Sequence, residues 1–315
     1  MLEFFHLPKA IPFMRYGKVT TTISLATFLF SVFSLFFFGL NLGVDFTGGT
    51  VMEVRYAQAA PLDNIRTSLT EMGYHEVAVQ NFGSTQDVLI RVPLKEGASS
   101  AQISEQVMGA LKKTAPDVTL SRVDFVGGQV GKELYENGGL ALLLVAAGII
   151  VYLAFRFEWR FAVSAAIANL HDVVIILGLF AFFQWQFDLT VLAGILAILG
   201  YSVNESVVVF DRIRENIRTM REDSIPDIID SAITTTMSRT IITHFCTQLM
   251  VLAMFFFGGE ALHNFALALT IGILFGIYSS VLVASPLLLL FGLQREHMIQ
   301  KEEKIEGMNA DGSVV

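Results

Sequence analysis

Residues Leu189–Phe210 read LTVLAGILAILGYSVNESVVVF, and this stretch decides the class of fold. It is apolar except for the adjacent Asn204 and Glu205, and about 20 such residues in a helix cross the hydrocarbon layer of a bilayer. Five more apolar runs flank it: Val19–Leu40, Gly139–Phe155, Phe161–Phe183, Thr240–Phe257 and Phe265–Leu293. The sequence therefore predicts a polytopic α-helical membrane protein with six transmembrane helices.

The composition of the 315 residues excludes several classes of protein. Hydrophobic residues make up 53% and charged residues 16%, with a mean hydropathy of +0.59, whereas a soluble domain carries about 25% charged residues. A net charge of −8 argues against a protein that coats nucleic acid. The single cysteine, Cys246, excludes an intramolecular disulfide and any multi-cysteine metal site.

The basic residues predict which side of the membrane each loop faces. Most Lys and Arg residues lie before the first run, between the second and third, between the fourth and fifth, and after the sixth. The short opposite loops, Gln184–Asp188 and Gly258–Asn264, have none. Because short cytoplasmic loops collect Lys and Arg, we expect both termini in the cytoplasm.

This orientation divides the chain into five parts: a cytoplasmic N-terminus (1–18), the first transmembrane helix (19–40), a periplasmic domain (41–138), a five-helix transmembrane region (139–293) and a cytoplasmic tail (294–315). The periplasmic domain reads as strand, helix, strand, strand, helix and strand, over Thr50–Ala57, Pro61–Met72, Val77–Phe82, Val88–Val92, Ser99–Lys113 and Val118–Val126. This βαββαβ order predicts a ferredoxin-like α+β fold. The domain has no nucleophile–base motif and no metal-ligand spacing, which favours a binding or mechanical role.

Ionisable residues inside the predicted spans are functional candidates, because burying a charge in lipid is costly. Glu205, beside Asn204, is either a carboxylate that exchanges a proton or Na⁺ or a structural polar group. Arg239 is either an arginine that reaches the cytoplasmic surface or the counter-ion of a buried carboxylate. Asp172, beside His171, belongs either to an ion path or to a hydrogen bond between helices.

Several motifs occur in a specific order along the chain: Gly43–Gly49 (GVDFTGG) after the first span, Phe125–Leu134 (FVGGQVGKEL) before the second, Phe155–Arg160 (FRFEWR) in the next loop, Gly200–Asn216 at the end of the fourth span and Ser238–Thr240 at the start of the fifth. Together they resemble the SecF family, the smaller membrane subunits of the bacterial protein-export accessory complex. The resemblance covers nearly the whole chain.

The resemblance implies a function that composition alone does not. Members pair with SecD in a twelve-span unit of the RND superfamily, in the bacterial inner membrane. They act with the SecYEG channel and, indirectly, with the SecA ATPase; YajC and YidC are further partners. The complex uses a gradient of H⁺ or Na⁺ to help draw a translocating polypeptide outward. The resemblance therefore predicts protein export, with no enzymatic activity and no metal or organic cofactor.

The resemblance also assigns roles to residues. The family's intramembrane acid and arginine map onto Glu205 and Arg239, although the family usually has Asp at the first position, and often Pro where this chain has Gly128. Protonation of Glu205 would weaken its attraction to Arg239 and shift the packing of the helices. The residues that would carry this shift to the periplasmic domain, as hinges or motif positions, are Asp45, Gly48, Gly49, Gly127 and Gly131.

Three rival functions remain open at this stage. An RND-type small-molecule exporter would use a similar ion relay, but one small exported domain and six spans argue against it. A structural scaffold for SecD would need no ion path of its own. A membrane-embedded hydrolase built on His171 and Asp172 lacks a paired-metal motif and a serine elbow.

Overall fold

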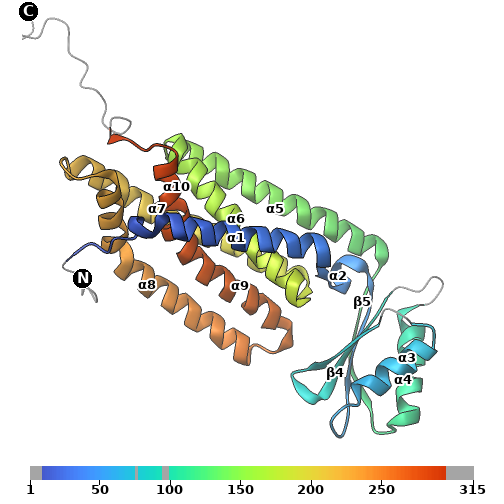
Figure 1. Ribbon diagram of the computed structural model, residues 1–315. Coiled ribbons are helices and arrows are strands. Elements are labelled where there is room, and N and C mark those ends of the chain that lie inside the picture. Colours follow the sequence, from blue (N-terminus) through green and yellow to red (C-terminus); the bar gives the residue numbers. More distant parts are fainter. Residues whose placement is uncertain (1–8, 75–76, 94–98, 296–315) are drawn as a thin grey trace, which may run out of the picture.

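The computed structural model describes residues 9–74, 77–93 and 99–295 (Figure 1). Within these ranges, six helices are long and apolar enough to cross a membrane, and a small sheet domain lies at one end of the helix bundle. The predicted fold class is therefore confirmed. Residues 1–8 of the predicted N-terminal segment and residues 296–315 of the predicted tail lie outside the described residues. The spans are α1 Gly17–Phe38, α5 Gly128–Arg156, α6 Trp159–Phe183, α7 Leu189–Thr219, α8 Ile225–Phe257, and a sixth span that begins with α9 Glu260–Ser279.

Three helices form the inside of the bundle. In α6, α7 and the sixth span, 56% of the apolar stretch is buried, against 17% in α1, 11% in α5 and 17% in α8. A helix that is apolar all round can face either protein or lipid, so hydropathy does not separate the two groups. The inner helices are the ones that carry Asp172 and Glu205.

Several helices extend beyond their apolar runs. Helix α5 begins at Gly128, well before the run that starts at Gly139. Helix α7 continues to Thr219, and α8 already begins at Ile225, where Ser224 caps its N-terminus by accepting a hydrogen bond from the Asp227 N–H. The long connection expected between the fourth and fifth spans is therefore mostly helical. An apolar run marks the part of a helix in hydrocarbon, whereas the helix ends are set by capping and packing.

The sixth span is not one regular helix, as the run Phe265–Leu293 suggested. After α9, residues Ser280–Ala284 form a π-helical turn, and α10 Ser285–Leu290 follows. Pro286 explains the interruption, because proline has no N–H and its ring clashes with the carbonyl four residues earlier. The Ser285 hydroxyl donates to the Ser280 carbonyl at 3.1 Å, which satisfies one of the backbone groups released there.

The sheet domain has the predicted βαββαβ order. Its elements are β2 Gly49–Arg55, α3 Leu62–Glu71, β3 Ala78–Phe82, β4 Ser84–Val92, α4 Ser100–Thr114 and β5 Thr119–Val126. The strands are all antiparallel and lie in the order β3-β4-β2-β5, as in a ferredoxin-like fold. Helices α3 and α4 cover one face (Figure 1), and alternate strand residues such as Met52, Val88 and Ile90 are buried with them. The expected loop over 83–87 shrinks to a tight turn at Gly83, since β4 begins at Ser84.

Two short elements at the junction of domain and bundle were not expected. Strand β1, Asn41–Leu42, pairs in parallel with β6, Gln186–Phe187, and α2 spans Val44–Thr47. The segment after the first span is thus bound to the loop between α6 and α7, far away in the sequence. This pairing fixes where the sheet domain meets the bundle.

Candidate functional site

A layer of buried polar side chains divides the bundle core. Along each inner helix, one apolar cluster ends and a second begins at this layer: α7 contributes Val191–Leu199 to one cluster and Val203–Ile217 to the other. We give the name polar layer to eight of the buried polar residues between the two clusters: Asp172, Ser202, Glu205, Ser206, Thr240, His244, Ser279 and Ser280. They come from α6, α7, α8 and the sixth span.

Asp172 lies at the junction of three helices. Its carboxyl is fully buried, with 0% of the residue exposed, and Oδ2 accepts hydrogen bonds from Ser202 on α7 and Ser279 on α9, each at 2.7 Å. The Nδ1 atom of His171 lies 3.4 Å from Oδ1. Hydroxyl donors on two neighbouring helices therefore depend on the protonation state of one carboxyl group.

The π-helical turn begins at this point of the sixth span. Ser279 contacts Asp172, while the next residue, Ser280, lies 3.1 Å from Ser206 on α7, oxygen to oxygen. In a regular helix adjacent side chains point about 100° apart, yet here both serines contact groups of the polar layer. Single π turns of this kind often occur at functional sites.

Glu205 lies against α8, one turn after Ser202 on α7. Only 5% of the residue is exposed; Oε1 accepts a hydrogen bond from the Thr240 hydroxyl at 2.5 Å, and Nδ1 of His244 lies 4.0 Å from Oε2. That same Nδ1 lies 2.8 Å from the Thr240 carbonyl, and the Tyr201 ring packs edge-on against the imidazole. Glu205, Thr240 and His244 form a compact group between two helices.

No basic side chain of the described residues except histidine lies beside either carboxyl group. Among the described residues, no Lys or Arg forms an ion pair with Glu205 or Asp172. An isolated carboxylate is costly at this depth, so each group gains from taking up a proton or from binding a cation through its oxygen atoms. The serine and threonine hydroxyls can serve either state, since a hydroxyl both donates and accepts.

The structure separates two predicted residues from the carboxyl groups. Arg239 is exposed, and in the part of the chain that is described it forms no ion pair with Glu205. Its neighbour Thr240 takes that place, because adjacent residues on a helix point about 100° apart. Asn204 is exposed as well, one position away from buried Glu205. The expected Glu205–Arg239 pair is not formed in this structure, and Asn204 does not join the polar layer.

The sequence predicted the two buried carboxyl groups but not the side chains that contact them. Thr240 and His244 lie four residues apart in an apolar run, which is a signal for one polar face of a helix. Ser279 gave no such signal, because serine is common in membrane helices. Its role follows only from the packing of α9 against α6.

The junction residues occupy close-packed positions. Asp45 accepts a hydrogen bond from the Leu189 N–H, at the first residue of α7, at 3.1 Å. Gly131 lies inside α5, where a β-carbon would come within 2.8 Å of the Gly48 nitrogen. Gly49 has a φ of +142°, and a β-carbon there would lie 2.7 Å from the Val92 carbonyl oxygen. Gly127 is the residue before α5 begins. Close approach of the backbone explains Gly49 and Gly131; the hinge role stays a prediction.

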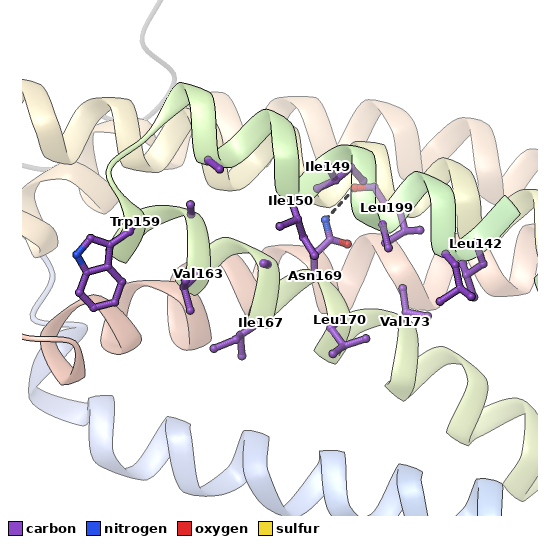
Figure 2. Close-up of a pocket in the computed structure, with 15 residues that line it drawn as sticks. Leu142, Ile149, Ile150, Trp159, Val163, Ile167, Asn169, Leu170, Val173 and Leu199 are labelled. Carbon is purple, nitrogen blue, oxygen red and sulfur yellow. Dashed lines mark hydrogen bonds between the residues drawn. The ribbon is translucent and has the colours of Figure 1, made fainter. Parts of the chain in front are cut away.

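A separate groove of about 520 Å³ lies between α5 and α6 (Figure 2). Its lining is apolar from Leu142 to Val173, apart from Asn169, which donates a hydrogen bond to the Leu199 carbonyl at 3.1 Å. An apolar groove offers no ligands to an ion. It is therefore not a part of the polar layer's chemistry.

Two family models match this chain. The family model described as the C-terminal part of the protein export membrane proteins SecD/SecF matches residues 106–294, and the model of the SecD/SecF GG motif matches residues 33–60. This chain belongs to the SecD/SecF family.

Relatives within the family support the assignment over nearly the full length. The chain is 44% identical to the protein translocase subunit SecF of Vibrio alginolyticus, over 99% of both chains. It is also 44% identical to the SecF of Haemophilus influenzae, over 91% of this chain and 88% of that one. These names are those of transport components and not of enzymes, which confirms the expectation of a non-enzymatic family member.

The fold agrees with a solved structure. SecDF from Thermus thermophilus, a translocon-associated membrane protein, superposes with a TM-score of 0.82 at 32% identity, over 92% of this chain. A second SecDF structure, in a super-membrane-facing form, gives a TM-score of 0.69 at 31% identity. This family member spans only 39% of either SecDF chain.

Proposed function

We propose that the chain is the SecF subunit of a SecD–SecF complex that uses an ion gradient to assist Sec-dependent protein export. Membership of the family, the names of its relatives and a SecDF chain more than twice as long support the pairing with SecD. In this proposal the complex lies in the bacterial inner membrane, with both termini cytoplasmic and residues 41–138 periplasmic. SecYEG, SecA, YajC and YidC are its further partners.

One observation carries the ion-coupling part of the proposal. Two carboxyl groups are buried against neighbouring helices: Asp172 accepts hydrogen bonds from Ser202 on α7 and Ser279 on α9, and Glu205 accepts one from Thr240 on α8. A charge buried at this depth has to be offset, and an ion that moves through the membrane potential supplies about 2.3 kcal/mol per 100 mV. That energy is comparable with the hydrogen bonds that hold these helices together.

The contacts suggest how an ion alters the packing. An ionised Glu205 only accepts hydrogen bonds, and it accepts one from Thr240. A protonated carboxyl carries a donor of its own, so the direction of the hydrogen bonds between Glu205 and α8 can reverse when Glu205 gains a proton. In this scheme α7 and α8 exchange one packing arrangement for another, through Thr240 and His244 rather than through Arg239.

The test replaces Glu205 by Gln. We expect gradient-dependent translocation of a secreted preprotein to be lost, because the amide keeps the shape but cannot ionise. Translocation is measured in membrane vesicles that contain SecD, SecYEG and SecA, with the H⁺ and Na⁺ gradients collapsed separately to identify the ion. Glu215→Gln is the matched control, since Glu215 is exposed near the end of the same helix.

Two further measurements keep the result interpretable. Co-purification with SecD shows whether the variant still folds and assembles. Glu205→Asp, which restores the residue usual in the family, is expected to keep activity. If the Gln variant assembles and exports at the normal rate under a gradient, ion coupling at Glu205 is rejected and a scaffold role is left.

A further inference from the structure

One arginine of the sheet domain lies where an exposed residue would be expected. In β4, the alternate residues Val88, Ile90 and Val92 point into the domain core, so Arg91 points to the opposite face of the sheet. That face is open to solvent for β5, most of whose residues are exposed. Arg91 nevertheless has only 9% of its surface exposed, because the loop between α6 and α7 covers it.

The contact partner of Arg91 is in that loop. Nη2 of Arg91 donates a hydrogen bond to Oε1 of Gln186. Gln186 belongs to β6, which pairs with β1, and its backbone carbonyl accepts from Asn264 at the start of α9 at 3.2 Å. The side chain of Arg91 therefore ends on a segment that is held both by β1 and by α9.

The same segment forms the N-terminus of α7. The Asp188 carboxylate caps the helix by accepting from the Val191 N–H at 3.0 Å, and the Asp45 carboxylate accepts from the Leu189 N–H at 3.1 Å. Two carboxylates at a helix N-terminus are stabilised by the helix dipole. Both of their charges act on Arg91, which makes the guanidinium the cation of this junction.

Burial of the charged guanidinium at this position is energetically unfavourable. Burial lowers the pKa of Arg91 to about 10, and the attraction of Asp188 and Asp45 only partly offsets this effect. Its Nε has no hydrogen-bond partner among the described residues. An arginine that served only the stability of the sheet would have a lower free energy if it were exposed to water. Its buried position therefore indicates a role at the junction.

We propose that Arg91 is the positioning residue that holds the sheet domain against β6, the segment that leads into the N-terminus of α7, the helix that carries Glu205. The domain and the N-terminus of α7 then move together. Gly48, Gly49 and Gly127 therefore do not act as free hinges where β4 meets β6. The role of this contact in export rests on the proposed function, in which ion binding at Glu205 shifts α7.

The experiment measures position and export in the same variants. Spin labels are placed at Lys113→Cys on α4 and Ala261→Cys on α9, both exposed, in a Cys246→Ser background. Distances are recorded by pulsed electron resonance on the full chain reconstituted with SecD. We expect a narrow distance distribution for the parent, a broad one for Arg91→Gln, and most of the gradient-dependent export to be lost with it.

Two variants separate positioning from a general loss of structure. Arg91→Lys keeps the charge and is expected to recover part of both readouts. Arg122→Gln, which replaces an exposed arginine on β5 of the same sheet, is expected to leave both unchanged. An unchanged distance distribution and normal export in Arg91→Gln would overturn the proposal, even if Glu205→Gln abolishes coupling.

The opposite result is equally distinct. If Arg91→Gln broadens the distances but neither it nor Glu205→Gln alters export, the junction is confirmed as a structural contact while the proposed ion coupling fails. If Arg91→Gln lowers export with no change in distances, Arg91 acts in some way other than positioning, and the inference is wrong.

Discussion

The sheet domain and the helix bundle bury opposite kinds of side chain. The domain encloses apolar residues such as Met52 and Ile90 and keeps its charged pairs outside, as with Arg55 and Asp87. The bundle exposes large apolar residues over its outer helices and encloses Asp172 and Glu205. Each region follows the solvent that surrounds it, which is water for the first and, in our proposal, lipid for the second.

This difference shows where functional chemistry can be recognised. In water, a buried apolar core is what any stable domain needs, so the core of the sheet domain says nothing about function. In lipid, apolar burial contributes little to the association of helices. Buried carboxyl groups destabilise the bundle, so their presence there indicates a function. The polar layer is therefore informative, whereas the domain's core is not.

The largest effect is expected from truncating the domain core. Met52→Ala removes a side chain with 0% exposure and should lower the stability of the sheet domain by about 2–5 kcal/mol, because it removes apolar burial and leaves a cavity. Phe36→Ala on α1, where 93% of the residue is exposed, should change stability little. Chemical denaturation of the full chain in detergent measures both; a comparable loss for Phe36 would contradict the assignment of α1 to the lipid-facing side.

A smaller effect is expected in the polar layer. Ser279→Ala removes one of the two hydroxyl donors to Asp172 and should cost about 1–2 kcal/mol. Thr22→Ala is its control, because that hydroxyl bonds to the Lys18 carbonyl on the exposed side of α1. Thermal unfolding in detergent compares them, and equal midpoints for the two variants would show that the Ser279 bond adds nothing.

The smallest effect is expected at the domain surface. Hydrogen bonds from Arg55 and then Ser84 hold the pKa of Asp87 below its usual 3.8. A lowered pKa means that this carboxylate stabilises the fold above about pH 4, and that the contribution is lost as the pH falls through the lowered value. Carboxyl-carbon NMR of Asp87 measures the pKa; Arg55→Gln should raise it, and no change would reject the pairing.

The sequence predicted the acids but not their partners. Glu205 and Asp172 are identifiable because a charged residue interrupts an apolar run. Whether Arg239 or Thr240 faces Glu205 depends on the rotation of α8 about its axis, and one position changes the direction by about 100°. The βαββαβ pattern gave the strand order of the domain, yet the pairing of β1 with β6 joins segments too short and too distant to be predicted.

Hydropathy and motif order by themselves determined the six spans, the domain fold and the family, since each depends on residues close in sequence or on their order. Only the tertiary structure decided three further features: the inner position of α6, α7 and α9, the hydroxyl partners of the two carboxyl groups, and the burial of Arg91 against Gln186. The physical reason is that these depend on how helices rotate and pack against one another, and a one-dimensional pattern does not contain that information.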